Sequence, residues 1–355
     1  MEKANNRDNF GNPDNSNNPN NRRNFIKAGV GACAVLGFGG ALSSLGAKGA
    51  DSTKTDSGKA DSGKSGKIDS SKLDSSKADS TSTSESSAKQ ESITLNNGVQ
   101  MPLIGLGTYA LTGAQGVSVV KEAAKLGYRL FDTAQMYNNE REVAQGLRES
   151  GVAREKLFIM TKLSSDMSYE ETKRHIDRTL AEMKLEYFDL LLLHRDFSSR
   201  DAMYRAMEEF YAQGKLKALG ISNFREKAYL DFIKTCKIMP AVNQMETHIF
   251  LQHSAYQKFM RENGGCALQS WSPFDSGRKG FFTNEILMKI AKKHNKSVAQ
   301  VALRWLTQRG VVAIPKTSKI ERLKENLNIF DFVLDESDLA QIAKLDTGKS
   351  SVGWW

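Results

Sequence analysis

The stretch Phe131-Asp132-Thr133-Ala134-Gln135-Met136-Tyr137 indicates how this chain folds. The apolar run that leads into it, residues 128–131, is typical of a buried strand, and an aspartate stands at its end. A tyrosine follows five residues later, in what we expect to be the next loop. In α/β proteins with parallel strands, functional side chains gather at the carboxyl ends of the strands. Asp132 and Tyr137 therefore predict a site at that edge.

Two later apolar runs end in a similar way. Residues 158–162 read Phe-Ile-Met-Thr-Lys and end at Lys162, and residues 190–194 read Leu-Leu-Leu-Leu-His and end at His194. Strands that are apolar throughout are expected where both faces of a parallel sheet are covered. Because consecutive strands are neighbours, we expect Asp132, Lys162 and His194 to converge, with Tyr137 folding over them.

From Ser92 onward, strand-like runs alternate with amphipathic helical stretches. The predicted strands cover residues 103–106, 128–132, 157–162, 190–194, 218–222, 241–246, 267–271 and 311–315. The predicted helices cover residues 116–126, 139–149, 169–183, 202–212, 226–235, 254–262, the region 284–307, and residues 320–327 and 336–345. Eight strands alternating with helices over about 250 residues are typical of an α/β chain that forms a (β/α)8 TIM barrel, and a doubly wound open sheet is the alternative. Residues 93–101 predict an N-terminal β-hairpin that turns at Asn97-Gly98.

The part of the chain before residue 92 has a different composition. Residues 1–20 are rich in Asn, and Arg22-Arg23 precede an uncharged segment, residues 28–47, rich in Gly and Ala. This pattern resembles a twin-arginine export signal, which predicts a periplasmic protein, with an uncleaved membrane anchor or a cytoplasmic location as alternatives. Residues 51–91 repeat Asp-Ser-x-Lys and predict a disordered linker. The expected organisation is a signal segment over 1–50, a linker over 51–91 and a barrel over 92–355.

The charge of the chain is modestly basic. It carries 50 Lys and Arg against 41 Asp and Glu, a formal net charge of +9. The excess is scattered and does not interleave with aromatic residues, which argues against a nucleic-acid partner. A solvated surface accounts for this excess of positive charge, and a pocket for an anionic cofactor is the more specific interpretation. The three cysteines and five histidines show no metal-ligand spacing.

The four side chains at the predicted rim suggest a site that reduces carbonyl groups. Such a reduction needs a hydride at carbon and a proton at oxygen, and Tyr137 is the candidate proton donor. Because free tyrosine titrates near ~10, we expect the positive charge of Lys162 to lower the pKa of Tyr137 toward the working range. Asp132 supplies a counter-charge for that lysine. His194 is expected to direct the substrate oxygen by a hydrogen bond.

A second group of residues predicts a phosphate site. Ile314-Pro315-Lys316-Thr317-Ser318 places a lysine and two hydroxyls at a strand-to-helix junction, where phosphates commonly bind. Arg322, one helical turn further, offers a planar fork for another phosphate group.

The pattern Gly105-x-Gly107-x-x-Ala110 mimics the dinucleotide fingerprint of an open sheet, but no helix is expected to begin directly after it. We interpret Gly107-Thr108-Tyr109 instead as the first barrel loop, which lines the cofactor and substrate cleft.

The region Ser92–Asp346 resembles the aldo-keto reductases, in particular bacterial reductases of small carbonyls similar to 2,5-diketogluconate reductases. The family's Asp, Tyr, Lys and His tetrad matches four positions here. The sequence around the first two, Asp-Thr-Ala-Gln-Met-Tyr-x-Asn-Glu at 132–140, is close to the family's own. The resemblance implies a metal-free reduction with NADPH as hydride donor, and the catalytic residues Asp132, Tyr137, Lys162 and His194. It implies cofactor contacts at Gly107, Thr108, Asp132, Ser222, Asn223, Gln244, Trp271, Ser272, Lys316, Thr317, Ser318, Arg322, Glu325 and Asn326. Substrate contacts are expected at Tyr109, Tyr137 and His194.

Three departures from the family concern the substrate. Arg195-Asp196 stand where the family often has Trp-Pro, and Tyr109 holds a position often given to tryptophan. The segment after Leu345 is short and ends in Trp354-Trp355, which suits the bacterial small-carbonyl reductases. The sequence thus predicts a monomeric reductase of small aldehydes or ketones, with the export machinery as a further partner. An NADPH-binding sensor or interaction subunit with little turnover is the alternative.

Overall fold

The computed structural model describes residues 91–353. The predicted signal segment, residues 51–90 of the predicted linker, and Trp354-Trp355 lie outside the described residues, so the division into three segments stays a prediction. No helix within 91–353 has the length and apolarity needed to cross a membrane.

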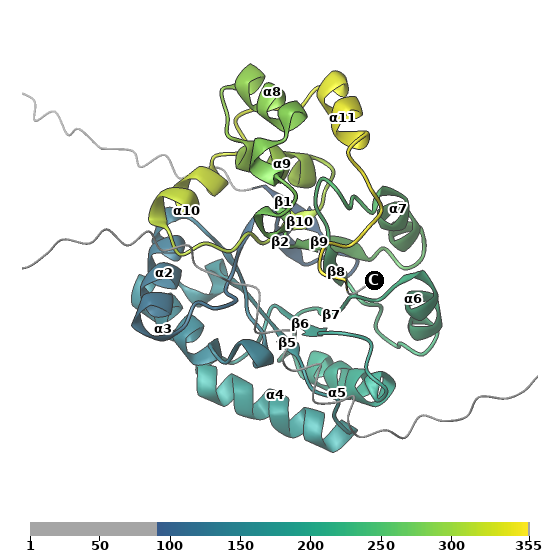
Figure 1. Cartoon of the computed structure of the whole chain (residues 1–355). Coiled ribbons are helices and arrows are strands. Elements are labelled where there is room, and N and C mark those ends of the chain that lie inside the picture. Colours follow the sequence, from purple (N-terminus) through teal and green to yellow (C-terminus); the bar gives the residue numbers. More distant parts are fainter. Residues whose placement is uncertain (1–90, 354–355) are drawn as a thin grey trace, which may run out of the picture. The chain divides into compact units, whose positions relative to one another are not determined.

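Eight parallel strands form a closed barrel inside a ring of helices (Figure 1). Each strand pairs with its neighbour in chain order, and a parallel bridge between Ile104 and Ala313 joins the first strand region to the last. The (β/α)8 prediction is therefore confirmed, and the open-sheet alternative is wrong. The barrel strands are β3 (Gly105–Gly107), β4 (Leu130–Asp132), β5 (Phe158–Leu163), β6 (Leu190–Leu193), β7 (Leu219–Ser222), β8 (Val242–Glu246), β9 (Ala267–Trp271) and β10 (Val312–Ala313).

Helices follow the strands along the chain and cover the outside of the barrel. The predicted region 284–307 is two helices, because Asn295 takes a left-handed conformation (φ 51°) and ends the first of them. The α-helices are α2 (Gly113–Leu126), α3 (Glu140–Ser150), α4 (Tyr169–Met183), α5 (Arg200–Ala212), α6 (Glu226–Ile233), α7 (Ser254–Glu262), α8 (Glu285–His294), α9 (Val298–Gln308), α10 (Ile320–Leu327) and α11 (Glu336–Ala343). Short 3-10 turns are η2 (Gln135–Tyr137), η3 (Arg154–Lys156), η4 (Asp275–Gly277) and η5 (Phe281–Thr283).

The predicted hairpin is present ahead of the barrel. Strands β1 (Ser92–Thr94) and β2 (Gln100–Pro102) pair antiparallel, with Ile93 opposite Met101. The turn lies one residue earlier than predicted. Gly98 N–H donates to Leu95 O over 2.9 Å, so two asparagines are its central residues and Gly98 adopts the left-handed φ of 87° that follows. Leu95 and Met101 join the apolar cluster inside the barrel, so the hairpin closes its amino-terminal end.

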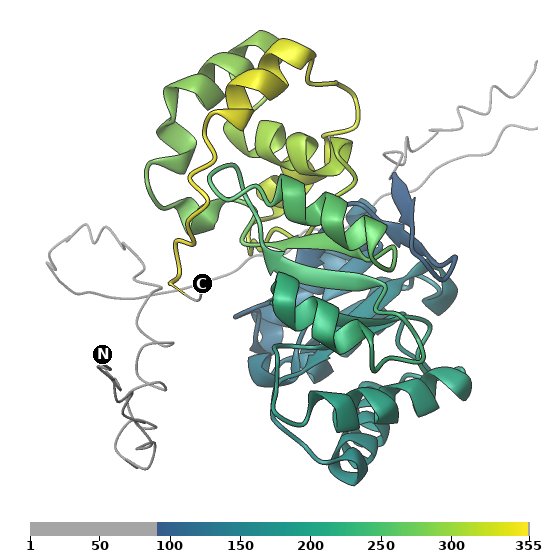
Figure 2. The same ribbon diagram turned by 90° about the vertical axis from the view of Figure 1, so that its right-hand side faces the viewer.

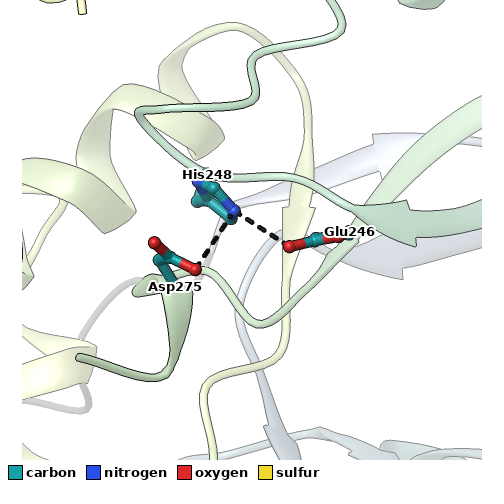
Figure 3. A group of neighbouring side chains, drawn as sticks. All are labelled: Glu246, His248 and Asp275. Carbon is teal, nitrogen blue, oxygen red and sulfur yellow. Dashed lines mark hydrogen bonds and ion pairs between the residues drawn. The ribbon is translucent and has the colours of Figure 1, made fainter. Parts of the chain in front are cut away.

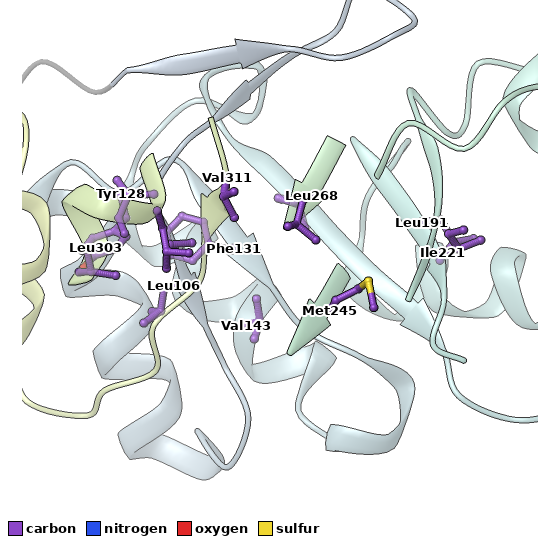
Figure 4. Packing of buried hydrophobic residues seen from close by; sticks show 14 of the residues in the cluster. Leu106, Tyr128, Phe131, Val143, Leu191, Ile221, Met245, Leu268, Leu303 and Val311 are labelled. Atoms are coloured by element: carbon purple, nitrogen blue, oxygen red, sulfur yellow. The ribbon is translucent and has the colours of Figure 1, made fainter. Parts of the chain in front are cut away.

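The apolar core has two layers, which follow from the alternation of side chains along each strand. On β6, Leu190 and Leu192 belong to the inner cluster, which fills the barrel. Leu191 and Leu193 belong to the outer cluster, which packs between the strands and the helices. Figure 4 shows part of the outer cluster, including Leu191. Burial on both faces explains why these strands are apolar throughout.

The chain after α11 returns toward the barrel. In Figure 2 this last segment runs down from α11 to the strands and helices near the C-terminus. Ser351 in this segment contacts Glu246 at the end of β8, and Thr347 N–H donates to Phe250 O over 3.0 Å. The described end of the chain therefore lies against the carboxyl-terminal side of the barrel, the side that carries the predicted site.

Candidate active site

Strand alternation directs an aspartate and a lysine into the mouth of the barrel. Leu130 and Met160 fill its interior, so Asp132 and Lys162, two residues further on β4 and β5, point inward one level higher. Lys162 Nζ lies 2.7 Å from Asp132 Oδ1, and both side chains are buried. The predicted convergence of these two residues is present in the structure.

Tyr137 and His194 complete the group. Tyr137 is the last residue of the 3-10 turn η2, and Lys162 Nζ donates to its hydroxyl over 3.4 Å. Lys162 also donates to Thr133 O over 2.9 Å, which fixes the ammonium below the turn. His194 directly follows β6, and its ring centroid lies 5.9 Å from that of Tyr137. All four predicted catalytic side chains therefore meet at one rim, and their chemical roles remain predictions.

The electrostatics of Tyr137 differ from the sequence prediction. Burial raises the pKa of Tyr137 above its ordinary value, and the charge of Lys162 offsets only part of that rise. The expectation of a lowered pKa is thus wrong in direction, because desolvation of the phenolate outweighs the nearby ammonium. The tyrosine keeps its proton at neutral pH, as a proton donor requires.

The two neighbouring bases have well-defined charge states. Burial by itself would lower the pKa of Lys162, but the charges and hydrogen bonds of Asp132 and Tyr137 together outweigh burial, and the pKa is raised. Lys162 is therefore cationic at neutral pH. Burial lowers the pKa of His194 well below its ordinary value, and the charges of Lys162 and Arg195 lower it further. His194 is therefore neutral, with one ring nitrogen as donor and the other as acceptor.

A second set of predicted residues is hydrogen-bonded to the first. Gln244 Nε2 donates to Asp132 Oδ2 over 2.8 Å and to Gln269 Oε1 over 2.9 Å. Within residues 91–353 no donor reaches Gln244 Oε1, which leaves an amide acceptor at the rim. Ser222 Oγ donates to the main-chain oxygen of Gln244 over 2.9 Å. The catalytic residues and these predicted cofactor-binding residues thus belong to one hydrogen-bonded network.

Asn223 and Trp271 extend this hydrogen-bonded network. Trp271 Nε1 donates to Asn223 Oδ1 over 2.9 Å, and Asn223 Nδ2 donates to His194 O over 3.3 Å. Asn223, directly after β7, has a left-handed φ of 62°, and Ser272, directly after β9, has one of 54°; tight loops at functional sites often hold such conformations. The indole of Trp271 is partly exposed.

The first barrel loop lies beside the tetrad, as predicted. Thr108 Oγ1 donates to Asp132 O over 2.9 Å, and Tyr109, half exposed, packs edge-on against Tyr137 with ring centroids 5.2 Å apart. A Cβ atom on Gly107 would lie 2.7 Å from Ile314 O. That glycine therefore allows close contact between β3 and the chain after β10. Residues 105–110 are not an open-sheet nucleotide loop.

The predicted phosphate residues follow β10. Lys316, Ser318 and Arg322 are exposed, and within residues 91–353 neither cation has an acidic partner. Thr317 is buried, and its hydroxyl accepts the backbone N–H of Lys319 over 3.1 Å at the start of α10. Unpaired cations beside a helix start suit an anionic group.

Glu325 and Asn326 are less open than the other residues of this set. The carboxylate of Glu325 accepts a short hydrogen bond from the hydroxyl of Ser297. Asn326 is buried, and its side chain lies beside the hydroxyl of Tyr128. The structure thus places both on α10 at the edge of the predicted cofactor site, and their contact with a cofactor stays a prediction.

Comparison with known proteins decides the family. The profile described as "Aldo/keto reductase family" matches residues 103–347. The chain belongs to the aldo/keto reductase family.

Individual members of the aldo/keto reductase family show the same relationship. The chain is 42% identical over 261 residues to the 9,11-endoperoxide prostaglandin H2 reductase of Trypanosoma cruzi, covering 72% of this chain and 92% of that protein. It is 42% identical over 262 residues to the glyoxal reductase of Bacillus subtilis, covering 72% and 93%. Among solved structures, the silkworm (Bombyx mori) aldo-keto reductase AKR2E5 in complex with NADPH has a TM-score of 0.69 at 29% identity, covering 74% and 89%.

Some residues at the aldo/keto reductase rim escaped the sequence prediction. Gln269 accepts a hydrogen bond from Gln244, and the sequence signal that could have identified it is an amide side chain in the middle of a buried strand, β9. Asn139 is buried, donates to Thr108 O and Leu111 O over 2.7 and 2.9 Å, and accepts from Thr133 Oγ1 over 2.8 Å. Asn139 thus links two loops by hydrogen bonds, and no local sequence pattern predicts this link.

A buried cluster on the same side of this reductase has a composition that could suit a metal. Glu246, His248 and Asp275 are fully buried and point toward one another (Figure 3). However, Phe250 N–H donates to His248 Nδ1 over 3.2 Å, so the ring proton resides on Nε2. Nε2 lies 3.2 Å from Glu246 Oε1 and 3.6 Å from Asp275 Oδ1. A protonated nitrogen has no lone pair for a metal, so we interpret the cluster as a hydrogen-bonded one.

The cluster of Glu246, His248 and Asp275 holds the end of the described chain. Ser351 N–H donates to Glu246 Oε1 over 3.1 Å, and Ser351 Oγ donates to Asp275 Oδ2 over 3.0 Å. Ser350 Oγ donates to the other oxygen of Glu246. These buried carboxyl groups thus anchor the C-terminal segment near the ends of β8 and β9.

Proposed function

We propose that the protein is an NADPH-dependent reductase that converts small aldehydes or ketones to alcohols. The observation that carries this proposal is the 3.4 Å contact between Lys162 Nζ and the Tyr137 hydroxyl, above the buried Asp132 carboxylate. A tyrosine that keeps its proton, placed over a fixed cation, is arranged to give that proton to an oxygen that gains negative charge.

The residues around the tetrad fit NADPH. The partly exposed ring of Trp271 would stack on the nicotinamide, and Ser222, Asn223 and Gln244 would hold its carboxamide. Lys316 and Arg322, cations without acidic partners among residues 91–353, would hold the phosphates, including the adenosine 2′-phosphate. When bound, the cofactor supplies the hydride. The NADPH complex of the similar silkworm reductase supports this choice.

The chain's own residues account for the proton. Tyr137 transfers its hydroxyl proton to the carbonyl oxygen as negative charge develops there. The ammonium of Lys162 stabilises the resulting phenolate, and Asp132 holds that ammonium in place. Neutral His194 fixes the direction of the carbonyl oxygen by a hydrogen bond.

The residues beside the tetrad and one relative bear on the substrate class. Tyr109 stands half exposed beside Tyr137, and Arg195, exposed, follows His194 directly. The similar glyoxal reductase of Bacillus subtilis is named for a small dicarbonyl, which supports small aldehydes and ketones as the substrate class.

Turnover of NADPH with a panel of small aldehydes and ketones, followed by its absorbance, tests the proposal. We expect Tyr137→Phe to lower kcat by about 10²- to 10⁴-fold while NADPH still binds, since only the proton donor is lost. Tyr169→Phe is the matched control, because Tyr169 lies on α4 and donates to Glu209. Tight NADPH binding without turnover, unchanged by Tyr137→Phe, would instead support the sensor alternative.

We further propose that the protein is a monomer exported to the periplasm by the twin-arginine route. Arg22-Arg23 ahead of a weakly apolar segment supports this. That route carries folded proteins, so the cofactor would be bound before export. Cell fractionation with N-terminal sequencing tests the location: we expect a shortened periplasmic form that disappears when Arg22 and Arg23 are both changed to Lys. An intact N-terminus in the cytosol would contradict export, and sedimentation would test the monomer.

A further inference from the structure

We infer that Ser164 is a positioning residue for His194: its hydroxyl donates to Nδ1, so that Nε2 carries the proton that directs the substrate oxygen. This inference rests on the proposed carbonyl reduction. Ser164 lies two residues beyond Lys162, just after β5, and no sequence motif predicted its contact with His194.

The contacts of Ser164 Oγ favour this direction of the hydrogen bond. Ser164 Oγ lies 2.7 Å from His194 Nδ1 and 3.4 Å from the main-chain oxygen of Lys162. A hydroxyl has one proton, and the shorter, better contact is with the imidazole. The backbone N–H of Met136, 3.4 Å away, points to Ser164 Oγ as a donor and occupies one of its lone pairs. On our inference the hydroxyl accepts from the backbone N–H of Met136 and gives its proton to the ring, not to the more distant oxygen of Lys162.

The backbone around Ser164 is fixed from two sides. Its N–H donates to Gln135 Oε1 over 2.7 Å, and Gln135 opens the 3-10 turn that ends at Tyr137. His194 N–H donates to Leu163 O over 3.0 Å. One short segment thus holds the proton-donor turn and the histidine in a fixed relation to each other.

The tautomer of His194 decides what the ring offers to a substrate. The imidazole is neutral, so exactly one of its nitrogens is protonated at a time. If Nδ1 accepts from Ser164, Nε2–H can donate to a carbonyl oxygen. In the opposite tautomer Nε2 would present a lone pair to that oxygen and repel it. Orientation by a second hydrogen bond is a general way in which proteins select a histidine tautomer.

Nitrogen NMR of the cofactor-free enzyme tests the tautomer without turnover. Long-range ¹H–¹⁵N correlation spectra of the chain's five histidines, with His194 assigned from a His194→Gln variant, report which ring nitrogen is protonated. We expect an unprotonated Nδ1 and a protonated Nε2 for His194 in the wild type. A protonated Nδ1 would overturn the inference, even if the enzyme reduces carbonyls.

Kinetics of variants test whether Ser164 acts through the histidine. Ser164→Ala should lower kcat for reduction roughly 5- to 30-fold, the range for losing one buried hydrogen bond, and leave NADPH affinity unchanged. It should also raise the pKa of His194 in an NMR titration, because a donor to Nδ1 stabilises the neutral ring. Ser164→Thr should restore both values, and Ser165→Ala, an exposed neighbour without a described side-chain contact, should change neither.

The outcomes separate this inference from the proposed function. An unchanged kcat and an unchanged His194 pKa in Ser164→Ala would overturn the positioning role while leaving carbonyl reduction in place. Absence of turnover in the wild type, together with the expected tautomer and pKa shift, would reject the function and support the Ser164–His194 relationship.

Discussion

Lys162 Nζ lies 2.7 Å from Asp132 Oδ1, and neither side chain is more than 2% exposed. The pair comes from neighbouring strands, β4 and β5, whose residues Asp132 and Met160 are in register. It stands at the level where the apolar filling of the barrel ends and the polar rim begins. Buried ion pairs of this kind are costly to break, since the remaining charge has no solvent to replace its partner.

Removing the ammonium should therefore destabilise the fold as well as stop the chemistry. We expect Lys162→Met to lower the free energy of unfolding by about 3–5 kcal/mol, because Asp132 is left as an uncompensated buried charge. Urea denaturation followed by circular dichroism measures this. The double variant Asp132→Asn/Lys162→Met should regain much of the loss. A single variant within about 1 kcal/mol of wild type would contradict a charged buried pair.

The raised pKa of Tyr137 makes a prediction about pH. Reduction requires the protonated hydroxyl, and burial raises the pKa of Tyr137 above its ordinary value near ~10. Since the proton is lost only when pH rises through that pKa, kcat/KM for reduction should stay level from neutral pH to about 10 and fall beyond it. A pH–rate profile over the stable range checks this. A fall centred near neutral pH would show that Lys162 dominates instead.

The cations after β10 should discriminate between the two nicotinamide cofactors. Lys316→Met and Arg322→Met each remove one charged contact to a phosphate, so we expect each to weaken NADPH binding about 10- to 100-fold. Binding of NADH, which lacks the 2′-phosphate, should change little in at least one of the two variants. Fluorescence titration measures both. Lys324→Met, exposed on the same helix, is the control, and equal losses of NADPH in all three variants would contradict the assignment.

A carboxylate far from the site should set part of the acid stability. Asp338, nearly fully buried on α11, accepts from His294 Nε2 over 2.7 Å and from Lys293 Nζ over 2.9 Å. Burial alone would raise the pKa of Asp338, but these hydrogen bonds outweigh burial and the pKa is lowered. A lowered folded-state pKa contributes stability above the unfolded value near ~3.9, and that contribution is lost as pH falls through the folded pKa.

The variant Asp338→Asn should therefore cost about 1–3 kcal/mol of unfolding free energy at neutral pH and progressively less below pH ~4. Denaturation at several pH values measures the difference from wild type. Asp331 is an exposed carboxylate that pairs with Lys296, so Asp331→Asn should cost at most about 1 kcal/mol and serves as control. A cost for Asp338→Asn that grows as the pH falls would contradict the lowered pKa.

The sequence predicted the architecture because its signals are local. Apolar runs such as 190–193 and amphipathic stretches such as 169–183 have a length and period that alternate regularly, so strand and helix order followed without tertiary information. Boundaries were less well predicted. His194 lies just beyond β6, and α2 begins at Gly113, three residues before the predicted start, because hydrogen bonding ends or extends elements beyond what apolar period shows.

The candidate site was predictable where its residues end strands. Asp132, Lys162, His194 and the rim residue Gln244 each follow an apolar strand position at a spacing of two, so an inward direction was implied by the alternation along a strand. Tyr137 in its 3-10 turn was identified only through its spacing from Asp132 and the resemblance to the family.

By itself, the sequence thus determined the barrel, the resemblance to the family and the four tetrad side chains at the rim, because each depends on local periodicity and on motifs of a few residues. The tertiary structure alone decided the net pKa shift of Tyr137, since that shift is a balance between desolvation and a charge whose strengths depend on three-dimensional burial. It also decided that Ser164 contacts His194 and that Ser351 contacts Glu246. These partners stand 30 and 105 residues apart in the chain, and only the pairing of β5 with β6 and the return of the C-terminal segment to β8 bring them within hydrogen-bonding distance.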